Sequence, residues 1–335
     1  MMNRAAPPYS SRRLALQLAR HALRSPGTFV QRVNGANLAH WRDARALHAT
    51  CNICGHQGPL LDEMLDLQPC ARHHIRPARE TLRCRGCGSK MRDRVVAAAL
   101  LDMLFDRGII APTIEALADV LPTHIRILDT DANSRIAQRL QHHPGFHRSL
   151  FLPGHANGEN LGEERLFNID LQEMPFRDRY FHVIITSDVM EHVRLVDRAH
   201  REIARCLRPI GEYIFTVPYD ETLPRTWLLV DPETDEDLVP EPHFHRDPEI
   251  RRQGIRSYRV FGPDLVDDLA AAGLTAEFVP ITRPEIGVFD GDVFRAALAQ
   301  ETSEHDGRAL PGQAAKAAAQ GGNARPSASE VVASS

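Results

Sequence analysis

Short apolar runs and helical patterns alternate along the chain from His124 onward. The helical segments repeat apolar positions every three or four residues, and the strand segments are short runs between polar or turn-forming residues. The predicted strands are Ile125–Thr130, Phe146–Leu152, Leu166–Ile169, His182–Ser187, Glu212–Val217 and Ala276–Ile281. The predicted helices are Arg92–Phe105, Ser134–Gln141, Leu195–Leu207 and Pro263–Ala272, with Gly273 as a C-cap. This order predicts an α/β fold with a doubly wound, mostly parallel sheet that binds ligands at the carboxyl ends of its strands.

The chain divides into segments of different composition. Residues 1–48 are rich in arginine, and an apolar helical face predicts a basic helical segment. This segment could contact a membrane surface or pack on the protein itself. Residues 49–91 predict a small cysteine-rich module and 92–300 the α/β domain. The tail 301–335 lacks apolar periodicity and is expected to be disordered.

Four cysteines stand in two Cys-x-x-Cys-Gly knuckles. They are Cys51, Cys54, Cys84 and Cys87. Two thiolate pairs of this spacing can complete the tetrahedral shell of a structural zinc ion, and four thiolates leave no open position for catalysis. The alternatives are disulfides or free thiols; disulfides require an oxidising compartment, and no signal-peptide pattern is seen. We therefore expect zinc and a cytoplasmic location. Cys70 and Cys206 lack a paired spacing and are expected to be ordinary thiols.

The net charge of −4 hides an asymmetry. Residues 1–100 hold sixteen basic and six acidic residues, so the remainder is strongly acidic. A basic first third can favour nucleic acid, but an acidic main body argues against wrapping a polynucleotide. No apolar run approaches the ~20 residues that cross a bilayer.

Residues 219–260 are predicted to be an insertion beside the ligand-binding edge. Its first part, 219–249, has ten acids and two arginines and too few apolar residues for a core. It is expected to be either a solvated acidic loop or a substrate lid that carries His243 and His245. With Asp247, these two histidines could also coordinate a metal.

Several motifs carry a family resemblance. They are Asp170–Phe176, Tyr180–Val193 with the run Ser-Asp-Val-Met-Glu-His-Val, Arg201–Pro209, Tyr213–Tyr219, Phe244–Pro248 and Phe261–Leu265. These segments resemble class I S-adenosylmethionine (SAM)-dependent methyltransferases of the type 11-like group. A four-cysteine module before an arginine-rich helix start, Met91–Arg94 here, also occurs in related methyltransferases. The resemblance covers roughly residues 50–298 and is most specific over 168–218.

The resemblance implies a SAM site at the carboxyl ends of the strands. The expected cofactor-binding residues are Asp129, Asp131, Asn133, Asp170, Leu171 and Ser187. Asp170 would accept from the adenine amine, with Leu171 against the ring. Asp131, Asn133 and Arg135 stand where the family has glycines. Asn133 could adopt a positive φ, and Asp131 or Ser134 could cap the next helix, so a turn can still form. The second predicted strand ends without the usual ribose-binding acid.

Methyl transfer needs in-line approach of a nucleophile and often a base. Asp188, Glu191 and His192 directly follow the central strand. His192 is the expected base, oriented by Glu191 or Asp188; alternatively, Glu191 and His192 merely cap the next helix.

The leading hypothesis is a SAM-dependent methyltransferase that acts on a small-molecule or glycan-type hydroxyl. One alternative is a non-catalytic methyltransferase-fold scaffold, suggested by the missing glycines and the missing ribose acid. A second is an RNA methyltransferase, because the basic first third would suit phosphate contacts.

Overall fold

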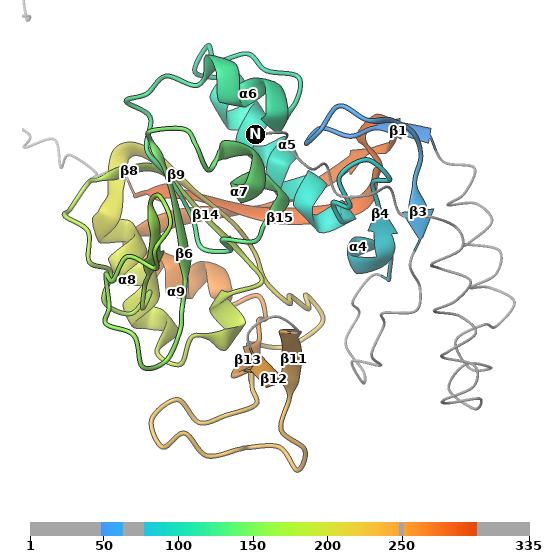
Figure 1. Ribbon diagram of the computed structural model, residues 1–335. Helices are drawn as coiled ribbons and strands as arrows, with labels where there is room; N and C mark the ends of the chain where they lie inside the picture. Colours follow the sequence, from blue (N-terminus) through green and yellow to red (C-terminus); the bar gives the residue numbers. More distant parts are fainter. Residues whose placement is uncertain (1–47, 63–76, 248–250, 300–335) are drawn as a thin grey trace, which may run out of the picture. The chain divides into compact units, whose positions relative to one another are not determined.

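The computed structural model describes residues 48–62, 77–247 and 251–299 (Figure 1). The predictions for the basic N-terminal helix, for Cys70 and for the tail from 301 lie outside these residues.

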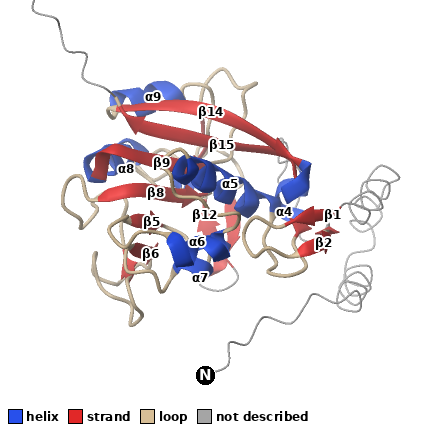
Figure 2. Cartoon of the chain, turned by 90° about the horizontal axis from the view of Figure 1, so that it is seen from above, coloured by secondary structure: helices blue, strands red, loops and turns tan. Residues whose placement is uncertain are grey.

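A seven-stranded sheet forms the centre of the fold. Its strands lie in the order β14 (Leu274–Arg283), β15 (Val288–Leu298), β9 (Leu207–Thr216), β8 (Phe181–Ser187), β5 (Ile127–Asp129), β6 (Phe146–Leu150) and β7 (Leu166–Asn168). The strands from β9 to β7 pair in parallel, and β15 runs antiparallel to both β9 and β14. Figure 2 shows the succession from β14 to β6 from above. The prediction of a mostly parallel α/β sheet is confirmed.

Apolar side chains that point alternately to the two sides of the central strands are buried on both faces of the sheet. On one face, Ile127 and Ile185 join the apolar side chains of α5 (Met91–Phe105), α6 (Ile114–Val120) and α7 (Arg135–Leu140). On the other, Leu128 and Ile184 join those of α8 (Val196–Cys206) and α9 (Leu265–Ala271). Successive residues of a strand point to opposite faces, so each strand serves both layers. Figure 1 shows the two helix groups on opposite sides of the sheet, as a doubly wound fold requires.

The cysteine-rich segment packs on the same core. β1 (His48–Thr50) pairs with β2 (Gln57–Pro59), and β3 (Leu61–Asp62) pairs with β4 (Leu82–Arg83), which follows α4 (Pro77–Thr81). This segment meets the turn between β14 and β15, which contains η3 (Pro284–Ile286). Gly287 ends that turn with φ of 77°, and a Cβ there would stand 2.8 Å from Leu60 and 3.2 Å from Arg94. Only glycine suits this backbone and this close approach.

The predicted insertion folds into two short strand pairs. β10 (Trp227–Leu228) pairs with β13 (Arg259–Val260), and β11 (Phe244–Asp247) pairs with β12 (Arg251–Arg256). Residues 219–249 were predicted to have too few apolar residues for a core, and the small buried cluster found here is completed by a residue outside that range. Leu229, Val230 and Val260 form a small buried cluster, because strand pairing brings Val260 back to the other two.

The structure also contains elements that the pattern did not predict. β15 is absent from the predicted strands because Asp290, Gly291 and Asp292 interrupt its apolar positions. Its pairing with β9 and β14 stabilises the strand in spite of these residues. The seven-residue α6 was also missed. β9 begins five residues earlier than predicted, at Leu207 directly after α8.

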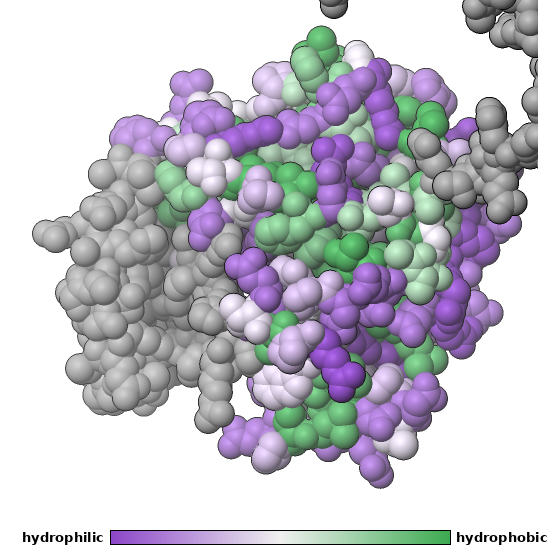
Figure 3. All heavy atoms as spheres, turned by 180° about the vertical axis from the view of Figure 1, so that it is seen from behind, coloured by the Kyte–Doolittle hydropathy of each residue, from purple (hydrophilic) through white to green (hydrophobic). Residues whose placement is uncertain are grey.

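Hydrophilic and hydrophobic residues are interspersed on the face seen in Figure 3. Scattered apolar side chains are normal for a protein surface. Within the described part of the chain, no helix combines the length and the apolar character needed to cross a membrane.

Candidate functional site

The strand order reverses between β5 and β8, and this defines the expected ligand edge. β5 is followed in space by β6 and β7 on one side and by β8 and β9 on the other. In open parallel sheets, ligands bind outside the carboxyl ends of the strands at such a switch point. Here the edge consists of the turn after Asp129 and the residues from Ser187 onward.

Side chains rather than glycines form the turn after β5. The buried Asp129 accepts from the Asp131 N–H at 3.0 Å and from the Ser134 hydroxyl at 2.5 Å. Asp131 accepts from the Asn133 N–H at 3.0 Å, and Ser134 caps α7 by accepting from the Ala137 N–H at 2.8 Å. Desolvation, with the nearby Asp131 charge, raises the pKa of Asp129 to about 8.

The expected capping by Ser134 is confirmed. The suggestion that Asn133 adopts a positive φ is wrong: the non-glycine residues with positive φ in the described ranges are Arg165, Arg179, Asp188 and Asp235. Backbone N–H groups that donate to the carboxylates of Asp129 and Asp131 close the turn instead, so no residue needs the left-handed backbone conformation.

Asp188 lies at the end of β8 in a left-handed conformation with φ of 52°. Both nitrogens of the Arg79 fork donate to its two oxygens at 2.7 Å, and the Thr216 hydroxyl donates at 2.9 Å. Arg92 Nε lies 3.2 Å from the same carboxylate. Burial alone would raise the pKa of Asp188, but the two guanidinium groups hold it well below its usual range.

Glu80 extends this ion network away from the sheet. It pairs with Arg79, Lys90 and Arg92 at 2.8 to 2.9 Å. Arg92 also donates to the Ser187 hydroxyl at 2.9 Å. The segment that carries the second knuckle is therefore tied to the carboxyl end of β8. Asp188 faces Arg79 and Arg92, not His192 as an orienting role would require.

Asp170 and Leu171 follow β7 at the same edge. The half-buried Asp170 carboxylate accepts from the Gln172 N–H and from its side-chain amide, both at 2.9 Å. Leu171 is buried. At the end of β6, Phe151 is 51% exposed, and the strand end carries no acid.

The predicted catalytic and lid residues meet beyond the end of β8. Glu191 and His192 lie in η2 (Met190–His192), and His245 lies in β11. His245 Nδ1 is 3.1 Å from His192 Nε2, and Glu191 Oε1 is 3.6 Å from His245 Nδ1 and 3.7 Å from His192 Nε2. Burial lowers the pKa of His192, whereas the Glu191 carboxylate outweighs burial and raises the pKa of His245.

His243 does not join this cluster. Its ring contacts Trp227 at 6.4 Å between centroids, so the two lid histidines have different surroundings. The side chain of Asp247, suggested as a metal ligand with these histidines, lies outside the described side chains.

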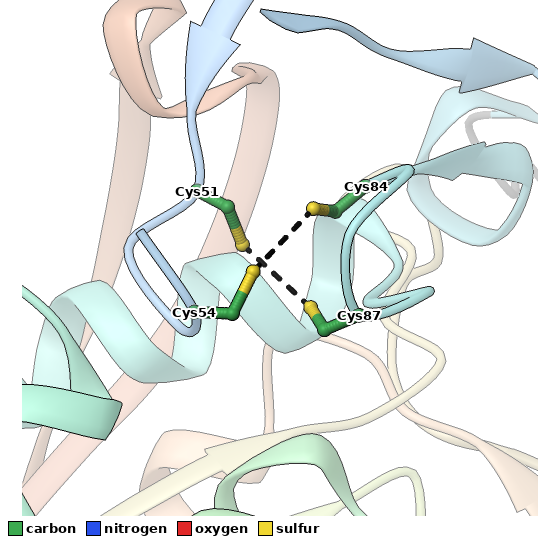
Figure 4. A group of neighbouring side chains, drawn as sticks. All are labelled: Cys51, Cys54, Cys84 and Cys87. Carbon is green, nitrogen blue, oxygen red and sulfur yellow. Dashed lines mark hydrogen bonds between the residues drawn. The ribbon is translucent and has the colours of Figure 1, made fainter. Parts of the chain in front are cut away.

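The four cysteines face one another in two crossed pairs (Figure 4). Cys51 Sγ is 3.8 Å from Cys87 Sγ, and Cys54 Sγ is 3.8 Å from Cys84 Sγ. A tetrahedron with metal–sulfur bonds of about 2.3 Å has edges of about 3.8 Å, so the thiols fit one tetrahedral ion. The same separation is far longer than a disulfide bond of about 2.05 Å. A disulfide is therefore not the state of these cysteines.

Arg94 is a site residue whose role the sequence did not reveal. Its fully buried guanidinium donates to the carbonyls of Ser89, Leu82 and Gly287 at 2.7 to 3.1 Å. Burial lowers its pKa, and the neighbouring thiol groups act in the opposite direction. A positive charge beside four thiolates offsets part of their negative charge.

A family model of methyltransferase domains matches residues 152–215. This part of the chain contains β7, β8, η2, α8 and most of β9, and thus Asp170, Ser187 and the Glu191–His192 pair. Neither the turn after Asp129 nor the cysteines fall within it. No curated protein matches the chain.

Similar solved structures include proteins of different activity. The [4+2]-cyclase SpnF is 18% identical over 64% of this chain and 67% of its own, with a TM-score of 0.34. The 1,6-didemethyltoxoflavin-N1-methyltransferase of Burkholderia thailandensis, solved with S-adenosylhomocysteine, is 17% identical over 62% and 87%, with a TM-score of 0.32. A SAM-dependent methyltransferase of Methanosarcina mazei is 18% identical over 55% and 97%, with a TM-score of 0.33. Similarities of this size identify neither a substrate nor a reaction, so the likeness to methyltransferase domains rests on the family match over residues 152–215.

Proposed function

We propose that the chain is a SAM-dependent methyltransferase that acts on a small-molecule or glycan-type hydroxyl. The observation that carries the proposal is the methyltransferase-domain match over residues 152–215, which lies on the strands beside the switch point of the sheet. Bound SAM would supply an electrophilic methyl group on a sulfonium sulfur. The protein would hold the cofactor and the acceptor in line.

The residues at the edge fit the adenine end of such a cofactor. Asp170 offers a half-buried carboxylate to an exocyclic amine, and the buried Leu171 offers an apolar surface to the ring. Asp129, Asp131, Asn133 and Ser187 are the further residues that would line the site. His192 is the proposed proton acceptor: its Nδ1 donates to the Arg256 carbonyl at 2.7 Å, which leaves the lone pair on Nε2, 3.1 Å from His245 Nδ1.

We also propose that Cys51, Cys54, Cys84 and Cys87 hold one structural zinc ion. The sulfur separations fit a tetrahedral shell, and Arg94 supplies a buried positive charge beside it. The ion would brace the segment that carries Arg79 and Arg92 to the end of β8.

A non-catalytic scaffold is the second candidate. It is favoured by the turn after Asp129, which lacks glycines, and by the ion network of Asp188 at the expected cofactor edge. An enzyme and a scaffold of this fold differ first in cofactor affinity.

Calorimetric titration of the full chain with SAM tests the proposal. Asp170→Ala should weaken binding roughly 5- to 150-fold, because an unpaired buried amine costs about 1–3 kcal/mol. Glu173→Ala is the matched control: it removes an exposed carboxylate three residues away and should leave the affinity unchanged. If the wild type shows no affinity at millimolar SAM, the scaffold becomes the leading candidate.

A further inference from the structure

Three ligand-type atoms converge beside the end of β8, although 53 residues separate two of them in the chain. They are Glu191 Oε1, His192 Nε2 and His245 Nδ1, at separations of 3.1, 3.6 and 3.7 Å. The circle through these three atoms has a radius of about 2.0 Å, which is the length of zinc–nitrogen and zinc–oxygen bonds (about 2.0–2.2 Å). An ion at its centre, or slightly above it, would contact all three ligands at bonding distance.

Glu191 lacks the partners that a buried carboxylate needs. Its side chain is 0% exposed, and neither carboxylate oxygen has a hydrogen-bond partner among the described residues. The two histidine nitrogens lie at ion-pair distance, beyond a hydrogen bond. A buried carboxylate without hydrogen bonds is costly, and the nearest titratable groups to this one are the two imidazoles.

The surrounding structure orients His192 as a ligand. Its Nδ1 donates to the Arg256 carbonyl at 2.7 Å, which directs the lone pair of Nε2 toward His245. Imidazoles that bind metals usually donate their other N–H to a carbonyl or a carboxylate in this way. Arg259 fixes the turn itself by donating to the carbonyls of Met190 and Val193 at 3.3 and 2.6 Å.

We propose that Glu191, His192 and His245 form a second metal site, which holds a divalent transition-metal ion such as Mn²⁺ or Zn²⁺. Two imidazoles and one carboxylate suit such ions better than Mg²⁺ or Ca²⁺, which prefer oxygen ligands. Three protein ligands leave coordination positions open, unlike four thiolates. His192 and His245 are 12% and 31% exposed, so the described residues do not fully enclose either imidazole.

The site assigns a different role to His192 from that of a proton acceptor. With Nε2 bound to the ion, His192 is a ligand. An acceptor hydroxyl bound at an open position would release its proton to solvent water more easily, because the ion stabilises the oxyanion. This last step rests on the proposed methyl transfer; ion binding itself does not.

The test is a titration with Mn²⁺ of the chain loaded with one equivalent of Zn²⁺, which the four thiolates bind in preference to two imidazoles and a carboxylate, followed by the electron paramagnetic resonance signal of free Mn²⁺. Thiolates bind Mn²⁺ poorly, so the four cysteines do not compete for this probe. The wild type should bind one Mn²⁺ per chain. His245→Ala should weaken binding by a factor of ten or more, whereas His243→Ala, two residues away and packed on Trp227, should bind like the wild type.

Glu191→Gln separates binding from folding. Without added Mn²⁺, this variant should melt at or above the wild-type temperature, because it removes a buried carboxylate that has no hydrogen bond among the described residues. Added Mn²⁺ should raise the melting temperature of the wild type but not that of the variant. The proposal is overturned if the wild type binds no Mn²⁺ up to millimolar concentration. It is also overturned if Glu191→Gln and His245→Ala bind Mn²⁺ as tightly as the wild type. Failure to bind SAM would leave the outcome of this titration unaffected.

Discussion

The pair of Arg79 and Asp188 offers the most direct test of how the cysteine-rich segment is held on the sheet. The two side chains form two hydrogen bonds of 2.7 Å across 109 residues of sequence, and they are only 13% and 19% exposed. The informative perturbations are Arg79→Met, which keeps an unbranched stem, and Asp188→Asn. Asparagine tolerates the left-handed conformation of residue 188, so the second change adds no backbone strain.

The expected coupling follows from the geometry. Opposite unit charges with centres about 4 Å apart attract by on the order of 4 kcal/mol at an effective dielectric constant of about 20. Part of this attraction survives Arg79→Met, because Arg92 remains 3.2 Å from the Asp188 carboxylate and Thr216 still donates to it. We therefore expect each single change to cost about 2–3 kcal/mol of unfolding free energy, and the double-mutant cycle to give a coupling of about 1–3 kcal/mol.

Urea unfolding of the zinc-loaded chain, with a single transition required for each variant, measures the cycle. Arg283 and Asp102 provide a matched control with the same paired geometry, at 2.9 and 2.6 Å, but with exposures of 42% and 39%. The cycle of Arg283→Met and Asp102→Asn should give about 0.2–1 kcal/mol, as exposed pairs do. A coupling at Arg79 and Asp188 no larger than the control value would refute the conclusion that this ion pair ties the segment to β8.

Two further predictions concern the turn after β5 and the cysteines. The pKa of Asp129 is raised from 3.8 to about 8, so the folded state holds the proton more tightly than the unfolded state. The contribution of this group to the free energy of unfolding is therefore fully present below about pH 4 and is lost as the pH rises to about 8. Asp129→Asn mimics the neutral form, so in thermal unfolding it should stabilise the protein at pH 8.5 but hardly at pH 4.5. The control is Asp119→Asn, which changes an exposed carboxylate. An equal effect of Asp129→Asn at both pH values would contradict the raised pKa. Cys84→Ser should lose one zinc ion per chain in elemental analysis and lower the melting temperature, because metal binding supplies folding free energy. A variant that retains the wild-type zinc content and melting temperature would argue against the four-cysteine site.

Local pattern alone determined the central strands and their helices. Apolar runs such as residues 183–185 are buried on both faces of the sheet, and this needs only continuous apolar character, which is visible in the sequence. The capping of α7 by Ser134 is equally local, because a cap involves residues three positions apart. The carboxyl ends of these strands, and with them Asp129, Asp170 and Ser187, follow from the same pattern.

The tertiary structure decided which of these groups face one another. Asp188 was expected, as an alternative to Glu191, to orient His192. It pairs with Arg79 instead, and no local pattern links residues 109 positions apart. His243 and His245 look equivalent in sequence, yet the pairing of β11 with β12 directs only His245 to Glu191 and His192. The formation of β15 also depends on tertiary structure, because its pairing with β9 and β14 stabilises a strand whose apolar pattern is interrupted. Contacts of this kind depend on strand order and register, which arise only when distant segments pack together.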